Sequence, residues 1–149
     1  MTISEFCNRE VVFTKRDTSI PQAARLMRDH HVGNLVIVEK EAGVRRPVGI
    51  VTDRDIVVEV LAKDVPLDSV TVGDIMSHDL LLGEEEDGLW TTIQRMRSRG
   101  IRRIPVVNAE GGLEGILTVD DIFELLSEEL AMLVRLIAHE QEREQEIRG

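Results

Sequence analysis

The sequence predicts an α/β (α+β) protein built from two copies of one strand-helix-strand-strand-helix unit. Two strings carry this prediction, Gly49-Ile-Val-Thr-Asp-Arg-Asp55 and Gly115-Ile-Leu-Thr-Val-Asp-Asp121, which share one residue pattern at an offset of 66. Upstream, residues 32–38 match residues 101–107 at an offset of 69. The three extra residues of the first copy fall in the polar loop between the matched stretches. An insertion confined to such a loop is typical of a duplicated structural unit.

Composition limits the kind of core and the kind of partner. A chain of 149 residues is enough for one compact domain or for two small halves that share a core. Apolar residues make up 42% of the chain, aromatic residues only 3%, and Tyr is absent, so the core is predicted to be aliphatic. The net charge of −10 argues against nucleic acid as a partner, because phosphate-backbone binding depends on Lys and Arg.

Cysteine and histidine give no sign of a metal centre. Cys7 is the single cysteine, so it cannot form an intrachain disulfide and is predicted to be a small apolar core residue. The pair His30-His31 closes a predicted helix, where solvent exposure is usual, and lacks further ligands. No stretch approaches the roughly 20 apolar residues of a membrane span, and no signal-peptide pattern is present. We therefore expect a cytoplasmic protein without a metal or a membrane partner.

The first unit is predicted to run from residue 2 to residue 66. Residues 2–10 form a leading turn whose apolar side chains tuck under the unit that follows. A strand at 11–13 precedes a helix that Thr18 or Ser19 can cap, with Pro21 in its first turn. The inner face of this helix is predicted at Ala23, Ala24, Leu26 and Met27, and Gly33 is predicted to end it. Two strands follow at 35–38 and 48–51, joined by a polar loop at 39–48, and a second helix is predicted at 53–63.

The second unit, residues 71–130, repeats this order. Its leading turn is predicted at 71–79 and its first strand at 80–82. A helix follows from about Leu89, and Gly100 is predicted to end it. Strands follow at 104–107 and 114–117, with Pro105 at a strand start or a sheet edge because it cannot donate a ladder hydrogen bond. Apolar residues then keep helical spacing as far as Ile137, which predicts one long helix that continues into a polar C-terminal extension, residues 131–149. Each unit has a sheet that it cannot cover alone, so face-to-face packing is expected.

The repeated Thr-x-x-Asp motif has two interpretations. Thr52 with Asp55, and Thr118 with Asp121, each fit a capping box, in which a hydroxyl and a carboxylate satisfy the helix start. Alternatively, a strand that runs directly into a helix presents free N–H groups as an anion site. An acid suits ribose hydroxyls and a nearby arginine suits phosphate, so the same residues also describe a nucleotide pocket.

The duplicated motif strongly resembles a pair of cystathionine-β-synthase-type (CBS) domains, the tandem called a Bateman module, over about residues 2–130. Both Gly-Ile-x-Thr strings and the upstream Arg-Ile-Pro-Val-Val carry the resemblance. It implies two βαββα CBS repeats packed through their sheets about a pseudo-twofold axis, with the long C-terminal helix added. It also implies regulation by an adenosyl ligand such as AMP, ADP, ATP or S-adenosylmethionine, no required cofactor, and a homodimer that signals through its shape or an unknown effector protein.

Carried over residue by residue, the resemblance predicts two unequal clefts. Ligand-binding positions are expected at Thr118, Asp121, Arg102, Arg103, Arg54, Thr52, Asp55 and Pro105. The stronger site is centred on Asp121, since Arg102 and Arg103 supply cations there, whereas Gly33 and Asn34 stand at the equivalent positions of the first repeat. The resemblance also places the adenine edge near residues 14–15 and 83–84.

No residues combine a nucleophile, a base and an orienting group, so we expect no catalytic site and no enzyme activity. The alternative to a ligand sensor is a ligand-free structural or protein-interaction module that docks through its C-terminal helix. The stripe at 130–137 suits helix pairing. The same stripe is equally compatible with a helix that folds back on its own domain or on a dimer mate.

Overall fold

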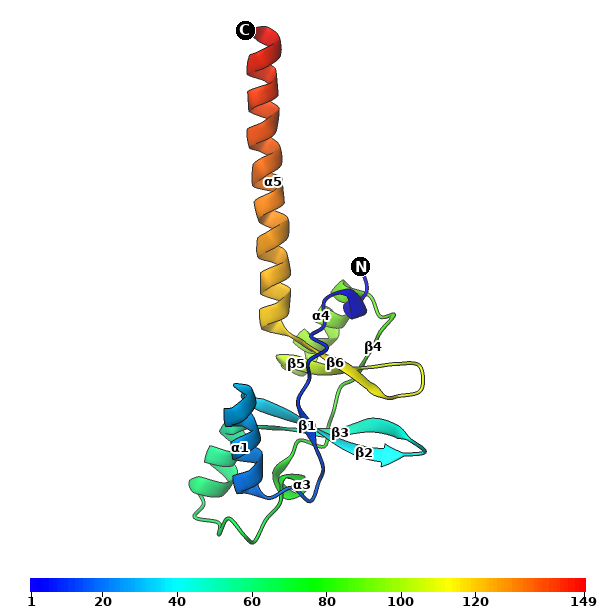
Figure 1. The fold of residues 1–149 in the computed structure, drawn as a ribbon, viewed down its shortest axis with the longest axis vertical. Coiled ribbons are helices and arrows are strands. Elements are labelled where there is room, and N and C mark those ends of the chain that lie inside the picture. The colour runs from blue at the N-terminus through cyan, green and yellow to red at the C-terminus, as the bar shows by residue number, and fades with distance from the viewer.

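The computed structural model describes all of residues 1–149 and shows the predicted repeat (Figure 1). The first repeat consists of β1 (Phe13–Thr14), α1 (Ile20–His30), β2 (Asn34–Glu41), β3 (Val44–Thr52), α2 (Asp53–Asp55) and the π-helical η2 (Ile56–Leu61). The second consists of β4 (Gly83–Glu84), α4 (Leu89–Arg99), β5 (Arg103–Val107), β6 (Leu113–Thr118) and α5 (Val119–Arg148). Two short leading helices, η1 (Ile3–Glu5) and α3 (Val72–Ile75), precede the repeats. The βαββα order is confirmed.

Each repeat contributes one three-stranded sheet, in the orders β1-β2-β3 and β4-β5-β6. The middle strand runs parallel to the first strand and antiparallel to the third. The first strands pair two or more residues later than predicted, at 13–14 and 83–84, because Val11 and Leu81 pack as loop residues against the cores. Pro105 is the third residue of the central strand β5, and β4 begins to pair only at Val106. Its missing N–H therefore lies where the ladder does not yet need it.

The two sheets pack face to face. Val36 and Val38 of β2 share a buried cluster with Ile116 of β6, and Val11 and Leu113 close its sides. Figure 1 shows both sheets between the helices of the first repeat and those of the second. Each sheet covers the apolar face of the other, which confirms the expected packing.

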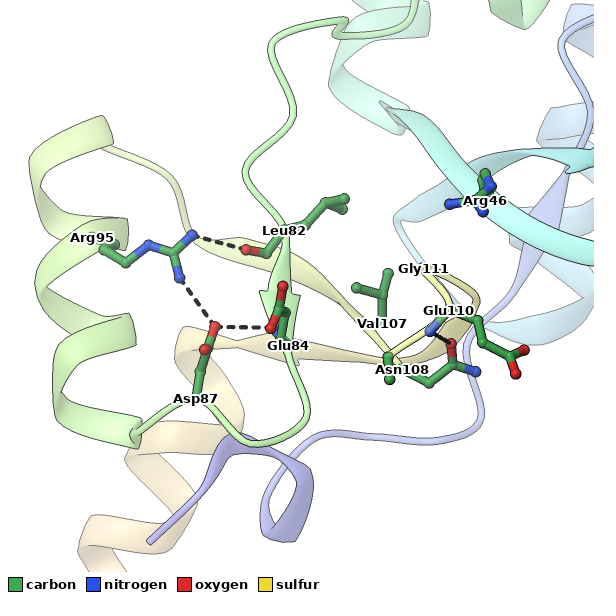
Figure 2. Close-up of a pocket in the computed structure, with 10 residues that line it drawn as sticks. Arg46, Leu82, Glu84, Asp87, Arg95, Val107, Asn108, Glu110 and Gly111 are labelled. Carbon is green, nitrogen blue, oxygen red and sulfur yellow. Dashed lines mark hydrogen bonds and ion pairs between the residues drawn. The ribbon is translucent and has the colours of Figure 1, made fainter.

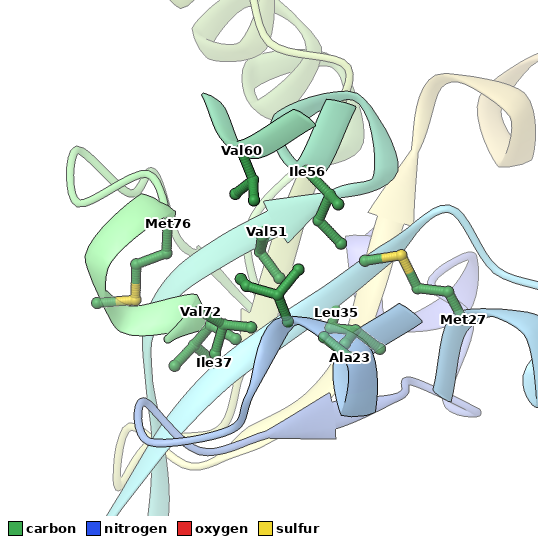
Figure 3. Packing of buried hydrophobic residues seen from close by; sticks show 10 residues of the cluster. Ala23, Met27, Leu35, Ile37, Val51, Ile56, Val60, Val72 and Met76 are labelled. Atoms are coloured by element: carbon green, nitrogen blue, oxygen red, sulfur yellow. The ribbon is translucent and has the colours of Figure 1, made fainter. Parts of the chain in front are cut away.

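The leading turns do not pack as predicted. Ile3 is fully buried in the second repeat's core, beside Leu89 and Ile104. Val72 and Met76 are buried in the first repeat's core, as Figure 3 shows. The expectation that each turn tucks under the unit that follows is therefore wrong: each turn packs on the opposite repeat.

The glycine that opens each repeated motif makes room for this exchange. A Cβ atom on Gly115 would lie 2.8 Å from the Asn8 carbonyl oxygen and 2.9 Å from the Cys7 sulfur. A Cβ atom on Gly49 would lie 2.5 Å from the Met76 sulfur. The backbone of Asn8 and Ile116 exchanges two hydrogen bonds at this approach, of 2.8 and 2.9 Å. The leading segment of each repeat thus lies against the motif strand of the other.

Local chemistry explains the ends of α1 and α4. Ser19 caps α1, where its hydroxyl accepts a hydrogen bond from the Gln22 N–H, and Pro21 fits the first turn. Gly100 ends α4 with a left-handed φ of 64°, as predicted. The corresponding stop of α1 was predicted at Gly33 but is His31, with φ 54°. Ala24, predicted on the inner face of α1, is exposed.

The polar loop predicted at residues 39–48 is instead a β-hairpin. β2 and β3 stay paired as far as Glu41 and Val44, and Ala42 and Gly43 form the turn with φ of 51° and 81°. Two positive φ angles give the twist that a tight hairpin requires. The three additional residues of the first repeat therefore lengthen a hairpin rather than a loop.

The C-terminal helix α5 is continuous over 30 residues, which confirms the predicted long helix. Ile122 and Leu125 anchor its first turns in the second repeat's core. From Leu126 onward the helix projects away from both repeats (Figure 1), and its large apolar side chains are exposed. At 1.5 Å per residue it is about 45 Å long. None of the helices is both long enough and apolar enough to span a membrane.

Substitution of Gly115 by alanine should destabilise the fold through the contact with the opposite leading segment. The new Cβ would overlap backbone and sulfur atoms, and overpacking of this kind costs about 1–3 kcal/mol. Gly88→Ala is the matched control, because the nearest atom to its Cβ would lie 3.8 Å away. Urea unfolding measures both free energies. Equal stability of the two variants would contradict the exchange of leading turns.

Candidate functional site

Both repeated Thr-x-x-Asp motifs form complete capping boxes. In the second repeat, the Asp121 N–H donates to the Thr118 hydroxyl at 3.2 Å, and Asp121 Oδ2 accepts from the Thr118 N–H at 3.0 Å. In the first repeat, the Asp55 N–H donates to the Thr52 hydroxyl at 3.1 Å, and Asp55 Oδ2 accepts from the Thr52 N–H at 2.8 Å. Both threonines have extended backbones where a strand passes directly into a helix. The structural interpretation of the motif is therefore confirmed.

The capping box leaves part of each carboxylate available. All hydrogen bonds of Asp121 and Asp55 side chains use Oδ2, so neither Oδ1 atom has a protein partner. Both aspartates are half-buried. A single aspartate can thus cap its helix with one oxygen and accept a ligand hydroxyl with the other.

The helix starts provide fewer free amides than expected. In α2, the N–H groups of Asp53, Arg54 and Asp55 donate to Gly33 O, Asp53 Oδ1 and Thr52 Oγ1 respectively. In α5, the Val119 N–H donates to Arg102 O and the Asp121 N–H to Thr118 Oγ1. The prediction of a free-amide anion site is therefore wrong for the first repeat, since its whole first turn is satisfied.

Cationic side chains gather in one cleft between the repeats. The cleft has a volume of ≈260 Å³, and its walls come from the starts of β2 and β5 and from the junction of β6 with α5. It is lined by Gly33, Asn34, Arg102, Arg103, Thr118, Val119 and Asp120. The pseudo-twofold relation thus brings Gly33 and Asn34 opposite their own counterparts, Arg102 and Arg103.

The two cleft arginines lack protein partners. Neither Arg102 nor Arg103 forms an ion pair, and Arg103 Nε is buried without a hydrogen-bond partner. An unpaired buried donor destabilises the folded state, and a bound acceptor would remove that penalty. Asp120 acts against anion binding, because its exposed carboxylate lines the same cleft and would repel an anion.

The structure brings together only part of the predicted site. Thr118, Arg102 and Arg103 line the cleft; Asp121 does not line it, but its capping hydrogen bonds hold it against Thr118. Thr52, Asp55, Arg54 and Pro105 do not line it. Arg54 is exposed and forms no ion pair, whereas Pro105 is buried in the sheet, opposite Ile116. Of the three arginines predicted to bind ligand, Arg102 and Arg103 line this cleft and Arg54 does not.

Sequence reasoning missed the second wall of the cleft and the leading segment beside it. One sequence signal could have identified the second wall: the offset of 69 aligns Gly33 and Asn34 with Arg102 and Arg103, and a pseudo-twofold axis places such equivalent positions opposite each other. Nothing in the sequence indicates that Cys7 and Asn8 lie against β6, beside Asp121.

The positions predicted near the adenine edge line two other hollows. Thr14 and Lys15 line a groove of ≈1060 Å³ on the first sheet. Glu84 lines a hollow of ≈640 Å³ (Figure 2). In this second hollow, Arg95 is held by Asp87 at 3.1 Å and by the Leu82 carbonyl at 2.9 Å. Its charge is neutralised within the protein, so this hollow suits an anion poorly.

Burial is the main influence on the pKa of Cys7, the single cysteine. It raises the pKa of the Cys7 thiol above its ordinary value; Arg9 partly offsets the rise, and the carboxylates of Glu85 and Asp121 add to it. The thiol therefore stays protonated at neutral pH, as expected for a packing residue. No three His, Cys, Asp or Glu side chains are grouped so that they could hold a metal ion.

The fold and the inter-repeat cleft define a tandem pair of repeats of the CBS type. The sequence pattern of the CBS domain matches residues 3–62 and 72–128. The chain belongs to the CBS domain family.

Three curated relatives resemble this chain over most of its length. MK0525 of Methanopyrus kandleri, an uncharacterized protein, is 33% identical over 84% of this chain and 62% of its own length. The CBS domain-containing protein YhcV of Bacillus subtilis is 32% identical over 81% of this chain and 82% of its own. A homoserine O-acetyltransferase of Methanosalsum zhilinae is 26% identical, and this chain spans only 24% of its length.

Solved structures of similar fold include two with bound adenosyl compounds. PAE2072 of Pyrobaculum aerophilum, complexed with AMP, has a TM-score of 0.72 and 27% identity, over 81% of this chain and 89% of its own. The CBS domain pair of MJ0100, in complex with 5′-methylthioadenosine and S-adenosyl-L-methionine, has a TM-score of 0.72 and 25% identity, over 85% and 99%.

Loss of a capping hydroxyl should destabilise either helix start by a similar amount. We expect Thr118→Ala and Thr52→Ala each to lower the free energy of unfolding by about 1 kcal/mol, because one first-turn amide loses its acceptor. Thr118→Ser keeps the hydroxyl and should retain most of the stability. Urea denaturation tests this, and no difference between the alanine and serine variants would disprove the cap.

Cys7 should react slowly with iodoacetamide in the folded protein. A raised thiol pKa lowers the thiolate fraction at any pH below it, so the alkylation rate should rise with pH at a higher midpoint than in the urea-unfolded chain. Mass spectrometry of timed samples measures the rate. A folded-state midpoint at or below the unfolded one would show that burial does not govern this thiol.

Proposed function

We propose that this chain is a non-catalytic regulatory module, acting in the cytoplasm, that binds an adenosyl ligand in the cleft between its two repeats. The observation that carries the proposal is the pair of unpaired arginines, with Arg103 Nε buried and unbonded, beside the Thr118–Asp121 motif. The AMP and S-adenosylmethionine complexes of similarly folded proteins support the same ligand class.

In this proposal each residue type has a distinct role. Asp121 Oδ1 accepts hydrogen bonds from the ribose hydroxyls, while Oδ2 keeps the helix cap. Arg102 and Arg103 bind phosphate or carboxylate oxygens, for which guanidinium groups are well suited. The base lies toward the apolar strand ends and the leading segment of the first repeat. AMP, ADP, ATP and S-adenosylmethionine all fit this description.

A second, weaker site is proposed around Thr52 and Asp55. It has the same capping geometry and the same free carboxylate oxygen, but Gly33 and Asn34 replace the two arginines. Arg54 is the remaining cation near this motif, and it is exposed and unpaired. We also keep Arg54 as a candidate phosphate contact of the stronger site, from across the pseudo-twofold axis, and Pro105 as a residue that shapes the strand beside that site.

The exposed apolar side chains of α5 favour one alternative function. A ligand-free module could dock an effector protein through this helix, as amphipathic helices dock in apolar grooves. Under the leading proposal, the same helix transmits the ligand signal within a homodimer or to a separate effector.

Thermal unfolding against AMP, ADP, ATP, S-adenosylmethionine and NAD tests the ligand proposal. A ligand that binds only the folded state, at 100 times its Kd, should stabilise it by about 2.7 kcal/mol, which raises Tm by several degrees. Arg103→Ala should abolish most of the shift for the phosphate-bearing ligands. Arg97→Ala, which removes an exposed and unpaired arginine of α4, is the matched control.

Two results would overturn the proposal. No Tm shift with any of the five compounds would leave the capping boxes as the whole explanation of the motif. A shift that survives Asp121→Ala but disappears with Asp55→Ala would place the stronger site in the other repeat.

A further inference from the structure

The outer part of α5 presents an apolar stripe that its own chain does not cover. The stripe consists of side chains spaced alternately three and four residues apart: Phe123, Leu126, Leu130, Leu133 and Ile137. Val119, four residues before Phe123, keeps the same spacing but is half-buried against the second repeat's core. This is the heptad spacing of helices that pair with other helices. Phe123 and Leu130 are each 63% exposed, although large apolar side chains of this number are rarely left in water on one face.

The stripe cannot be buried by its own chain. The helix has no Gly or Pro from Val119 to Arg148, so nothing in it permits a bend back onto the repeats. Ile122 and Leu125, which do dock on the second repeat, lie beside the stripe rather than on it. Its cover must therefore come from another molecule.

We infer that the α5 stripe pairs with the same stripe of a second copy of this chain, in the antiparallel direction. A heptad stripe is self-complementary, so two copies related by a twofold axis bury it on both helices at once. When Leu130 lies opposite Leu133 of the second copy, Leu126 lies opposite Ile137, while Phe123 and Val119 lie opposite Glu140 and Glu144.

Charge decides the direction of pairing. The stripe spacing continues past Ile137 to Glu140 and Glu144. In a parallel pair, these glutamates would face their own copies across the seam, and like charges there are destabilising. In the antiparallel pair, they lie beside the second copy's helix start instead, where Val119 lines the cleft with the unpaired Arg102 and Arg103.

The pairing gives the proposed regulatory module a direct link between assembly and site. The acidic end of one copy lies close to the cationic cleft of the other, so ligand binding and pairing act on the same charges. The pairing itself does not require that any ligand binds, so its failure and the failure of the ligand proposal are separate results.

Sedimentation velocity of the full chain tests the surface. Leu130→Glu combined with Leu133→Glu should halve the mass of the assembly, because two charges then enter the seam. Met132→Glu is the matched control, since Met132 is 61% exposed on a different side of α5, and it should leave the mass unchanged. Circular dichroism confirms that the variants keep their helices. A wild-type monomer, or an assembly that the double variant leaves intact, would overturn the inference.

Disulfide trapping tests the direction, in a Cys7→Ser background. Chains with Ile137→Cys alone should not cross-link, because the antiparallel register separates the two copies of residue 137 by about 16 Å along the axis. A mixture of Ile137→Cys and Leu126→Cys chains should form the mixed dimer, because these positions face each other within disulfide reach. Cross-linking of Ile137→Cys to itself, with no mixed dimer, would show parallel pairing and overturn the inference.

Discussion

Each motif glycine lies against the leading segment of the opposite repeat, and this pair of contacts holds the two repeats in one frame. At Gly115, a side chain as small as a methyl group would overlap Asn8 and Cys7; at Gly49 it would overlap Met76. The exchange puts Ile3 in one core and Val72 in the other, so neither core is complete without residues from both repeats. This reciprocal burial joins the two repeats into one packed body. It also fixes the sheet-to-sheet geometry from which the cleft arises.

The reciprocal frame is symmetric, but its side chains are not. The starts of β2 and β5 meet across one cleft, with Gly33 and Asn34 on one side and Arg102 and Arg103 on the other. A symmetric cleft lined by four arginines would repel itself, whereas one lined by none would hold no anion. The substitution of two small neutral residues on one wall leaves both space and a net attraction for a single anionic group.

The parts of this structure that could be predicted are those that local chemistry determines. The Thr118–Asp121 cap follows from spacing alone, and β-branched runs indicate the central strands β2 and β5. The exchange of leading turns could not be predicted, because Ile3 fits either core equally well by hydrophobicity. The hairpin at Ala42–Gly43 was missed because charged residues on an exposed edge resemble a loop. The cleft was half predicted: the arginines were identified, but the wall that faces them depends on how the repeats pack.

The capping box and the proposed ligand site use the same carboxylate, and the geometry of the cap is compatible with both roles. Here Oδ2 is held by the Thr118 N–H and hydroxyl, at 3.0 and 2.9 Å, and this orients Oδ1 without using it. Orientation by the cap lowers the conformational entropy lost when a hydroxyl binds. In the proposed site, a ligand hydroxyl would therefore meet an acceptor that is already oriented, and the arginines of the cleft would favour a ligand that carries an anionic group.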